Sequence, residues 1–388
     1  MTRPAVPALT VVVLWLAGLG AAGQFAKIAV AFPALQALYP QAGTSLGLAV
    51  SLISLLGALL GVVAGMIVAR LGLRRMLLWG LWLGAALSLA QAILPGLGAL
   101  LATRLVEGLS HLVIVVAAPT LISETVADRW RGAALTLWST FFGVAFALFA
   151  WAGLPLVDSH GPGALFALHG AWMAAMALWL SVLLPTARLV RVTDPLTWRA
   201  VLARHAAIYR SPALSAPALG WLCYTLTFVS LLTLLPGVME PSSPGWLLGA
   251  LPLTSIAVAL TLGVALLRKL SAVQVILLGF AASAIAVAAL LALPGPLWPV
   301  FALFAALALV QSASFAAVPE LASDPADRAL ANGALAQMGN VGNLLGMPLL
   351  LAILGLGGAT AGLLAVMTAY LAGLGLHLAL ARARRARA

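Results

Sequence analysis

The sequence predicts an all-α membrane protein with about twelve transmembrane helices in two pseudo-symmetric six-helix halves. Three observations predict it. The 388 residues are 64% hydrophobic and only 7% charged, with a mean hydropathy of +1.14, whereas soluble domains carry about 25% charged residues. Long apolar runs follow one another along almost the whole chain. The two halves of the chain also repeat each other. This composition excludes an ordinary soluble enzyme, a disordered chain and a fibrous protein.

Each apolar run is interpreted as one helix, because backbone groups in hydrocarbon must form their hydrogen bonds within the segment. A spanning helix and a short loop take roughly 30 residues, so no room remains for a sizeable soluble domain. In the first half the expected spans are residues 8–36, 45–69, 76–95, 98–122, 132–156 and 164–185. In the second half they are residues 213–238, 245–267, 271–293, 297–320, 331–355 and 359–381.

The longest polar stretch, residues 186–211, separates the two sets of spans. We therefore expect an N-terminal half over residues 1–186, a cytoplasmic central linker over residues 187–211 and a C-terminal half over residues 212–388. The C-terminal half ends in a short basic tail. Within the linker, residues 196–209 are expected to form an amphipathic helix on the membrane surface.

The charged residues indicate the orientation of the chain. Nearly all Lys and Arg outside the spans fall on one predicted side, whereas the opposite loops carry only Asp158, His160 and Glu240 near their tips. The positive-inside rule then places both termini in the cytoplasm of a multi-pass protein of a bacterial-type inner membrane. The net charge of +11 therefore reflects topology and contact with anionic membrane lipid. A nucleic-acid partner is not expected, because no folded domain would bind it.

An internal repeat relates the two halves. Helix one ends in a Pro-containing segment at residues 32–35, and helix seven ends in a similar one at residues 235–238. Helix four closes with Ala-Ala-Pro at residues 117–119, and helix ten closes with a related pattern at residues 316–319. Two six-helix halves related by an axis along the membrane normal are typical of transporters, with the substrate near the midplane between them.

Three motifs resemble those of the major facilitator superfamily. Residues 65–75, Gly-Met-Ile-Val-Ala-Arg-Leu-Gly-Leu-Arg-Arg, resemble its signature loop, Gly-x-x-x-Asp-Arg-x-Gly-Arg-Arg. Residues 104–108, Arg-Leu-Val-Glu-Gly, resemble its second motif, Arg-x-x-x-Gly. Glu124 with Arg131 and Gly132 resembles the pattern that closes helix four. The resemblance covers the whole chain. It implies a transporter rather than an enzyme, usually a monomer, whose two halves rock about a central site.

The resemblance also implies a gate on the cytoplasmic side. Ala69 stands where the family has an Asp that helps to lock the halves together. The lock is therefore expected to depend on Arg70 and Arg75 pairing with Glu124 or Asp128. The implied gating and motif residues are Gly65, Arg70, Gly72, Arg74, Arg75, Glu124, Arg131, Glu320 and Arg328.

Ionisable residues inside the spans are candidates for function, because burying one costs at least about 2.5–3.5 kcal/mol without a partner or a wet cavity. Arg104, Glu107 and His111 recur at i, i+3 and i+7, so they share one face of helix four. We expect Arg104 to hold an anionic group, Glu107 to carry a coupling proton and His111 to join either task. The alternative is a closed ion pair of Arg104 and Glu107 that only braces the first half.

Helix one supplies two further candidates. Lys27 and Gln24 lie three residues apart and share a face. A cationic pocket formed by Lys27 and Arg104 would bind a carboxylate or a similar anion. The alternative is that Lys27 snorkels outward to the lipid headgroups.

Uncharged polar residues supply the candidates of the second half. Gln337 and Asn340 lie in helix eleven, Tyr224 lies in helix seven, and Gln311 in helix ten is a further candidate. Each could instead be polar glue between helices. The sequence offers no metal-ligand spacing and no cofactor motif. The glycine-rich run at residues 18–23 matches a dinucleotide pattern by its letters, but it follows no strand and indicates close helix packing.

The expected function is secondary transport of a small organic or inorganic anion by alternating access, coupled to proton symport. The main alternative is export of a drug or metabolite by proton antiport, although helix five lacks the Gly-Pro pair of the family's antiporter motif. A receptor or scaffold built on the same fold is a third possibility.

Overall fold

The computed structural model of the chain describes residues 8–185, 197–239, 247–293 and 295–386, and all regular elements in these residues are helices. The first half contains α1 (Ala8–Leu38), η1 (Pro40–Gly47), α2 (Leu48–Leu71), α3 (Leu73–Ala92), α4 (Leu97–Thr125), α5 (Asp128–Ser139), α6 (Phe141–Leu148), η2 (Phe149–Gly153) and α7 (Leu154–Leu183). The second contains α8 (Trp198–Arg210), α9 (Ser215–Met239), α10 (Leu247–Val258), η3 (Ala259–Gly263), α11 (Val264–Leu267), α12 (Ala272–Ala292), α13 (Trp298–Leu321) and α14 (Pro325–Arg385).

The lengths of these helices fit a membrane protein. Nine segments of the described chain are long and apolar enough to cross a bilayer. The two longest, with 56 and 61 residues, exceed the roughly 20 residues of one crossing and must each cross twice. Each reverses at a glycine, Gly161 with φ 78° and Gly358 with φ 66°, in the left-handed region that glycine tolerates. With α3, the described chain makes about twelve crossings, as the apolar runs predict.

Two expected spans differ from a straight helix. Within the described residues, the run at residues 245–267 is divided into α10, the π-helical η3 and α11. The run at residues 132–156 is divided into α5, α6 and the π-helical η2. The first break lies at Thr140, whose hydroxyl donates to the carbonyl oxygen of Leu137 at 2.8 Å. The expected linker helix is present as α8, and its first turn is capped by the side chain of Thr197. The exact limits of the two halves stay a prediction, and residues 186–196 lie outside the described residues.

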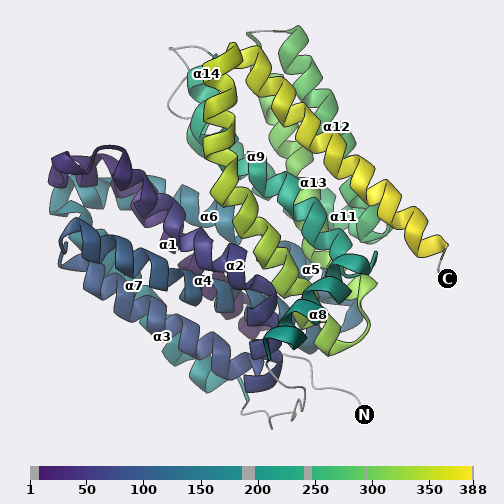
Figure 1. Cartoon of the computed structure of the whole chain (residues 1–388), viewed down its shortest axis with the longest axis horizontal. Coiled ribbons are helices and arrows are strands. Elements are labelled where there is room, and N and C mark those ends of the chain that lie inside the picture. Colours follow the sequence, from purple (N-terminus) through teal and green to yellow (C-terminus); the bar gives the residue numbers. More distant parts are fainter. Residues whose placement is uncertain (1–7, 186–196, 240–246, 294, 387–388) are drawn as a thin grey trace.

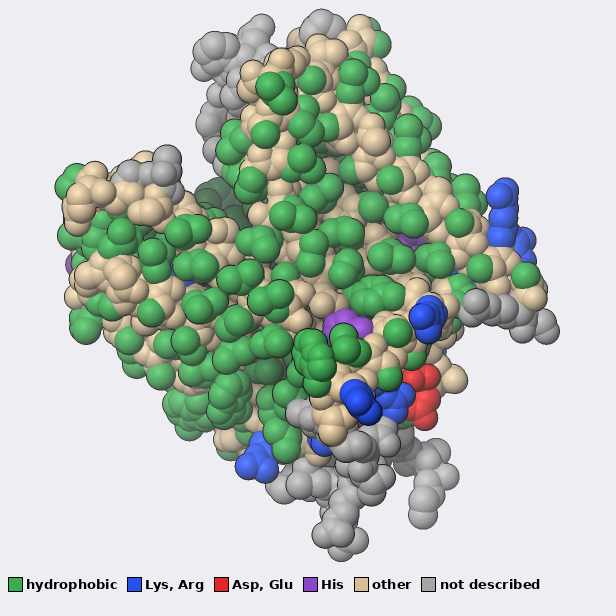
Figure 2. Space-filling view, in the orientation of Figure 1, with side chains coloured by type: hydrophobic (Ala, Val, Ile, Leu, Met, Phe, Trp, Pro, Cys, Tyr) green, Lys and Arg blue, Asp and Glu red, His purple; other side chains and the backbone are tan. Residues whose placement is uncertain are grey.

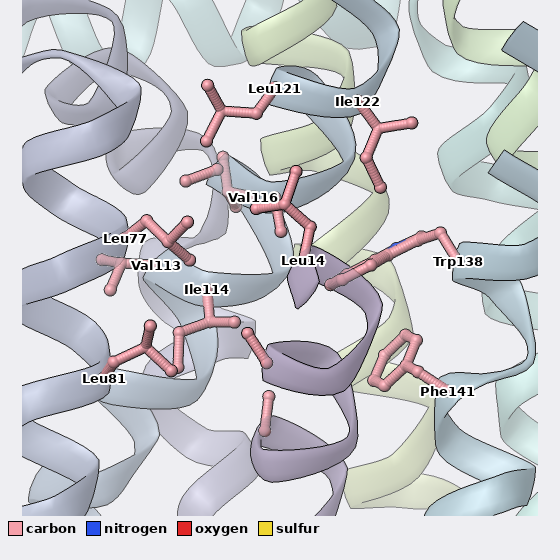
Figure 3. Packing of buried hydrophobic residues seen from close by; sticks show 14 of the residues in the cluster. Leu14, Leu77, Leu81, Val113, Ile114, Val116, Leu121, Ile122, Trp138 and Phe141 are labelled. Atoms are coloured by element: carbon pink, nitrogen blue, oxygen red, sulfur yellow. The ribbon is translucent and has the colours of Figure 1, made fainter. Parts of the chain in front are cut away.

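The helices form two groups, α1–α7 and α9–α14, each with its own packed interior (Figure 1). In the first group, Leu14, Leu77, Val113, Trp138 and Phe141 bring side chains from five helices together (Figure 3). Lipid tails are as apolar as leucine, so such packing is held by close van der Waals contact rather than by exclusion of water.

The outer surface is suited to lipid. Hydrophobic side chains cover most of the face seen in Figure 2, whereas Lys and Arg gather toward its lower and right-hand edges. Large apolar side chains are fully open to the surroundings, such as Leu356 at 92% and Ile285 at 70% exposure. A soluble monomer rarely exposes so extensive an apolar surface.

The two halves meet closely along α2 and α14. A Cβ on Gly333 of α14 would lie only 2.7 Å from the carbonyl oxygen of Gly61 on α2, and one on Gly65 would lie 2.8 Å from the carbonyl oxygen of Ala329. Small residues therefore let the two backbones touch. This α2–α14 seam lies at the end of α2 and the beginning of α14, beside α8, and it holds the halves together at that end of the molecule.

The seam predicts opposite effects of one substitution at two sites on α14. Gly333→Ala should lower the free energy of unfolding by about 1–3 kcal/mol, because the new methyl group forces two backbones apart. Gly375→Ala should raise it by up to about 1 kcal/mol, because a Cβ there meets open space and alanine is the better helix former. Denaturant unfolding of the purified protein in detergent compares the two. Equal changes in the free energy of unfolding for the two variants would show that the seam does not depend on glycine at residue 333.

Candidate functional site

Three charged side chains meet inside the first half. Nζ of Lys27 lies 2.6 Å from Oε1 of Glu107, and Nη1 of Arg104 donates to Oε2 of the same carboxylate. All three side chains are 0% exposed. With ordinary ionisation this cluster, called here the buried triad, carries two positive charges and one negative charge. Its net charge is therefore +1.

The carboxylate of Glu107 is surrounded by donors. Nε2 of Gln91, on α3, donates to Oε2 at 2.9 Å, in addition to the donors from Lys27 and Arg104. Nε of Arg104 donates to the carbonyl oxygen of Ala49 on α2 at 2.7 Å. The Glu107 carboxylate thus connects α1, α3 and α4, and Arg104 extends the network to α2. This density of hydrogen bonds is what a buried charge needs.

Lys27 has a second set of partners. Its Nζ donates to Oγ of Ser88 at 2.6 Å, and Oγ of Ser88 lies 2.7 Å from Nδ1 of His169 on α7. Nε2 of His169 donates to the carbonyl oxygen of Gly20 on α1 at 2.8 Å. The ring of Phe166 lies 5.6 Å from Nζ of Lys27, within cation–π range. Lys27 therefore points into the helical bundle in this structure and not out to lipid.

Small residues of α1 make this arrangement possible. A Cβ on Gly23 would collide with the ring of His169, and one on Gly20 would collide with Met173. The glycine-rich run of α1 thus lets α7 approach closely, in agreement with the packing expected for it. Gln24 contributes on another side, since its Nε2 donates to Oγ of Ser110 at 2.8 Å.

A cavity lies between the two halves, and no residue of the buried triad is among its lining residues. Its walls are aromatic and uncharged polar side chains, and no Lys, Arg, Asp or Glu is among its lining residues. Residues from both halves line it: His111, Val115, Ser139, Phe141, Phe142, Trp221, Tyr224, Thr225, Phe228, Val229, Gln311, Phe315, Leu335, Ala336, Gly339, Asn340 and Asn343.

His111 is the titratable histidine of the cavity wall. Its Nδ1 lies 3.1 Å from the carbonyl oxygen of Ala21, and since a carbonyl only accepts, Nδ1 is the donor. Nε2 is then left to accept a proton or a hydrogen bond. The edge of the Phe25 ring packs against the imidazole, with the ring centroids 5.0 Å apart. The imidazole of His111 therefore faces the cavity from the same face of α4 as Arg104 and Glu107.

Polar groups of the second half complete the cavity. The hydroxyl of Tyr224 donates to Oε1 of Gln311 at 2.9 Å, and Nε2 of Gln311 donates to the carbonyl oxygen of Ser139 in the first half. Oδ1 of Asn340 and Oδ1 of Asn343 are buried and have no hydrogen-bond partner among the described residues. Unpaired buried polar atoms are costly, so these two oxygens are available to a solute.

Gln337 does not line the cavity. Its Nε2 donates to the carbonyl oxygen of Ala58 on α2 at 2.9 Å, and its Oε1 accepts from the hydroxyl of Tyr209 on α8 at 2.7 Å. Burial raises the pKa of Tyr209, so this hydroxyl remains a donor at neutral pH. Gln337 therefore joins α14, α2 and α8 at the α2–α14 seam.

The signature-loop arginines lie at helix ends. Arg74 donates from Nε and Nη2 to two carbonyl oxygens at the end of α7, at 2.9 and 2.7 Å. Nη2 of Arg70 is buried without a hydrogen-bond partner among the described residues, and Arg75 is exposed. Glu124 is half-buried. Gly72 has φ 87° between α2 and α3, where its freedom from a side chain is required.

The remaining motif residues repeat between the halves. Nε of Arg131 donates to the carbonyl oxygen of Ser123 at 2.8 Å, and Nε of Arg328 donates to that of Ala322 at 2.9 Å. Arg131 also pairs with Asp128 at 2.5 Å, so Asp128 is engaged within its own half. On the other half, Oε2 of Glu320 accepts from the backbone of α12, at Ala272 N, 2.6 Å away. These residues therefore stabilise the ends of neighbouring helices through hydrogen bonds to the backbone.

The structure thus divides the predicted binding residues into three sets. His111, Tyr224 and Asn340 line the cavity. The hydrogen-bonded interior of the first half contains Lys27, Arg104, Glu107 and Gln24, and Gln337 lies at the seam.

Sequence reasoning missed Ser88 and His169. His169 could have been found, because a histidine inside a predicted span is an ionisable residue at membrane depth, like Lys27 and Arg104. Within the described chain, no group of three or more His, Cys, Asp or Glu is arranged to hold a metal.

Comparisons with known proteins agree with this architecture. The family model described as Major Facilitator Superfamily matches residues 14–304. The crystal structure of the human organic anion transporter MFSD10 (TETRAN) has a TM-score of 0.80 and 19% identity, covering 96% of this chain and 99% of that chain. FucP in the outward conformation has a TM-score of 0.75 and 14% identity, covering 97% and 99%. The E. coli fucose:proton symporter FucP, in another structure, has a TM-score of 0.73 and 13% identity over the same shares. No curated protein sequence matches the chain.

The charge balance of the buried triad predicts an asymmetry between two substitutions. Glu107→Gln should lower the free energy of unfolding by about 3–5 kcal/mol, because it leaves two buried cations without a counter-charge. Lys27→Met should cost less than about 2 kcal/mol, because Arg104 and Gln91 still satisfy Glu107. Thermal or denaturant unfolding in detergent measures both. An equal or larger cost for Lys27→Met would show that the triad is not organised around Glu107.

Proposed function

The chain belongs to the Major Facilitator Superfamily, and from this premise we propose that it carries a small organic anion across the membrane together with a proton. The two halves alternate access to the cavity between them, as in secondary transporters of this architecture. The observation that carries the proposal is the pairing of an aromatic cavity free of carboxylates with a buried triad of net charge +1.

The shape of the cavity favours an organic solute over a bare inorganic ion. The ring of Trp221 packs against two others, with its centroid 4.5 Å from that of Tyr224 and 5.1 Å from that of Phe315. Phe142 adds an aromatic wall from the first half. Flat or apolar groups pack well on such rings. Tyr224, Asn340 and Asn343 then supply a few polar contacts, as in most small-molecule sites.

The proposed negative charge of the solute rests on the net charge of +1 that the buried triad gives the first half. An unbalanced positive charge in a low-dielectric interior favours a negative charge nearby. The lining of the cavity provides no carboxylate to do this. An anionic group close to His111, on the face of α4 shared with Arg104 and Glu107, would compensate the charge. A cationic solute would be disfavoured by the same field.

The coupling proton is assigned to the same face of α4. Nε2 of His111 is the position that can take up a proton next to a bound anion, and Glu107 lies one helical turn behind it. Protonated His111 would be a second donor toward the anion. Binding of the anion and of the proton would therefore favour each other, which is the requirement for symport.

The gate and the orientation complete the proposal. The positive-inside rule makes the end of the molecule beside α8 the cytoplasmic side of a bacterial-type inner membrane. The closed α2–α14 seam then shuts the cavity off from the cytoplasm in this conformation. Glycine packing and the junction at Gln337 close this end, beside the proposed lock of Arg70 and Arg75 with Glu124. The transporter is proposed to act as a monomer surrounded by lipid.

The aromatic walls also support the runner-up function, export of an apolar drug or metabolite by proton antiport. The two proposals differ in the charge of the solute and in the direction of the proton. Symport of an anion requires accumulation on the side to which protons flow, whereas antiport requires expulsion toward the side from which they come.

Flux into proteoliposomes tests the proposal. Labelled aromatic sulfonates and dicarboxylates cross bilayers poorly and represent the anions, with matched sulfonamides and benzylammonium as the neutral and cationic controls. An inward proton gradient should drive accumulation of anions alone. If only the cations move, in the direction opposite to proton flow, the antiport proposal replaces this one. An absence of flux for every probe would reject both proposals.

Replacing His111 tests the site. His111→Gln keeps a donor for the carbonyl of Ala21 but removes the titratable Nε2, so proton-driven accumulation should fall about 100-fold or more. His377→Gln is the matched control, since His377 is also buried but lies in the second half outside the cavity. Equal proton-driven accumulation in His111→Gln and His377→Gln would show that His111 has no role in the site.

A further inference from the structure

A hydrogen-bonded chain leads from the buried triad to α7 and has no part in the function proposed so far. It runs from Nζ of Lys27 to Oγ of Ser88 over 2.6 Å and from there to Nδ1 of His169 over 2.7 Å. Lys27 and Ser88 are 0% exposed and His169 is 3% exposed. Three helices, α1, α3 and α7, contribute one residue each.

The direction of every hydrogen bond in this chain is fixed by one carbonyl group. The oxygen of Gly20 can only accept, so Nε2 of His169, 2.8 Å away, carries a hydrogen. In neutral His169 the other nitrogen, Nδ1, is then an acceptor. Ser88 has one hydroxyl hydrogen and donates it to Nδ1, which leaves Oγ to accept from Lys27. The contact of Ser88 with Glu107 is longer, at 3.4 Å.

We infer that Lys27, Ser88 and His169 form a proton chain inside the first half, which shifts a proton from Lys27 to His169 when His111 takes up the coupling proton; this rests on the proposed proton-coupled transport. The step is a concerted shift of two protons. One N–H bond of the Lys27 ammonium breaks as an O–H bond forms on Ser88, and the original O–H bond of Ser88 breaks as an N–H bond forms on Nδ1 of His169.

The atoms and charges balance without another reactant. Before the shift Lys27 is an ammonium and His169 is neutral; afterwards Lys27 is a neutral amine and His169 is an imidazolium. Ser88 is regenerated with its hydroxyl turned toward Lys27. Both hydrogen bonds of the chain survive with donor and acceptor exchanged, so the shift breaks neither of them.

The shift changes the charge that surrounds Glu107. With the proton on Lys27, two cations flank the carboxylate; with the proton on His169, only Arg104 does. These are the charged groups that α1 and α4 bring to the chain. From α3 come the uncharged Ser88 and Gln91, and from η2 the ring of Phe149, whose centroid lies 6.1 Å from that of His169.

The chain is also connected to the cavity through α1. His169 binds the carbonyl oxygen of Gly20, and His111 binds that of the next residue, Ala21, from the cavity side. A solute that moves His111 therefore acts on a backbone segment that positions His169. Gly23 adds to this constraint, because a Cβ there would collide with the His169 ring. Ser88 and His169 are thus positioning residues for the proton rather than contacts of the solute.

Substitution of Ser88 tests the chain while keeping the ion pair of Lys27 with Glu107. The readout is the ratio of proton-driven accumulation to anion exchange at equal pH, measured in proteoliposomes with an aromatic sulfonate. Ser88→Ala should lower this ratio about tenfold or more, and Ser88→Thr, which keeps the hydroxyl, should restore it. Ser283→Ala is the matched control, a fully buried serine of α12 that bonds only within its own helix. An unchanged ratio in Ser88→Ala would overturn the inference.

A second measurement does not depend on transport. Nitrogen NMR of histidine-labelled protein in lipid, with the signals of His169 assigned through His169→Gln, should show hydrogen on Nε2 and a hydrogen-bonded, unprotonated Nδ1 at high pH. Ser88→Ala should shift the Nδ1 signal. A neutral His169 with its hydrogen on Nδ1 would overturn the chain. If no probe is transported but these signals are found, the proposed function fails and the chain itself stands.

Discussion

One carboxylate, that of Glu107, determines how the first half is built. Two buried cations beside it would cost several kcal/mol each without a counter-charge, and Glu107 supplies the one negative charge they share. The position of Lys27 fixes α1 against α4, and two hydrogen bonds fix α3: Gln91 donates to Glu107, and Ser88 accepts from Lys27. The glycines of α1 let α7 approach closely, which brings His169 to Ser88. The packing of this half therefore reflects the need to surround the Glu107 carboxylate with hydrogen-bond donors inside a membrane protein.

The second half has the same helical plan and a different chemistry. Its buried polar side chains in the described chain are neutral groups and His377, without a counterpart of the triad. The first half therefore holds the buried charges, whereas the second half supplies the amide groups and part of the aromatic wall of the cavity, with Trp221, Tyr224 and Asn340. Rocking one half against the other would change the distance between a solute at His111 and the buried triad, which would link the position of the anion to the charge of the first half.

The sequence predicts the membrane spans and the two halves, because long apolar runs and the repeat are local signals. It also predicts that Arg104, Glu107 and His111 share a face of α4, because helical spacing alone sets this. It does not reveal that these side chains meet different surroundings, since His111 lies at the cavity and Glu107 contacts α3. Glu107 meets Gln91 and Ser88 of α3, and single polar residues in an apolar run resemble ordinary packing. The position of Gln337 depends on the docking of α8, a contact distant in sequence.

Proton uptake on anion binding tests the central claim most directly. Purified protein in weakly buffered detergent near neutral pH is mixed with an aromatic sulfonate, and a pH dye follows the solution. If the anion and the proton favour each other, up to about one proton should be taken up per anion bound, by linkage. The buffer should become more alkaline, and His111→Gln should abolish the change. Anion binding with no proton uptake, or with proton release, would contradict the account.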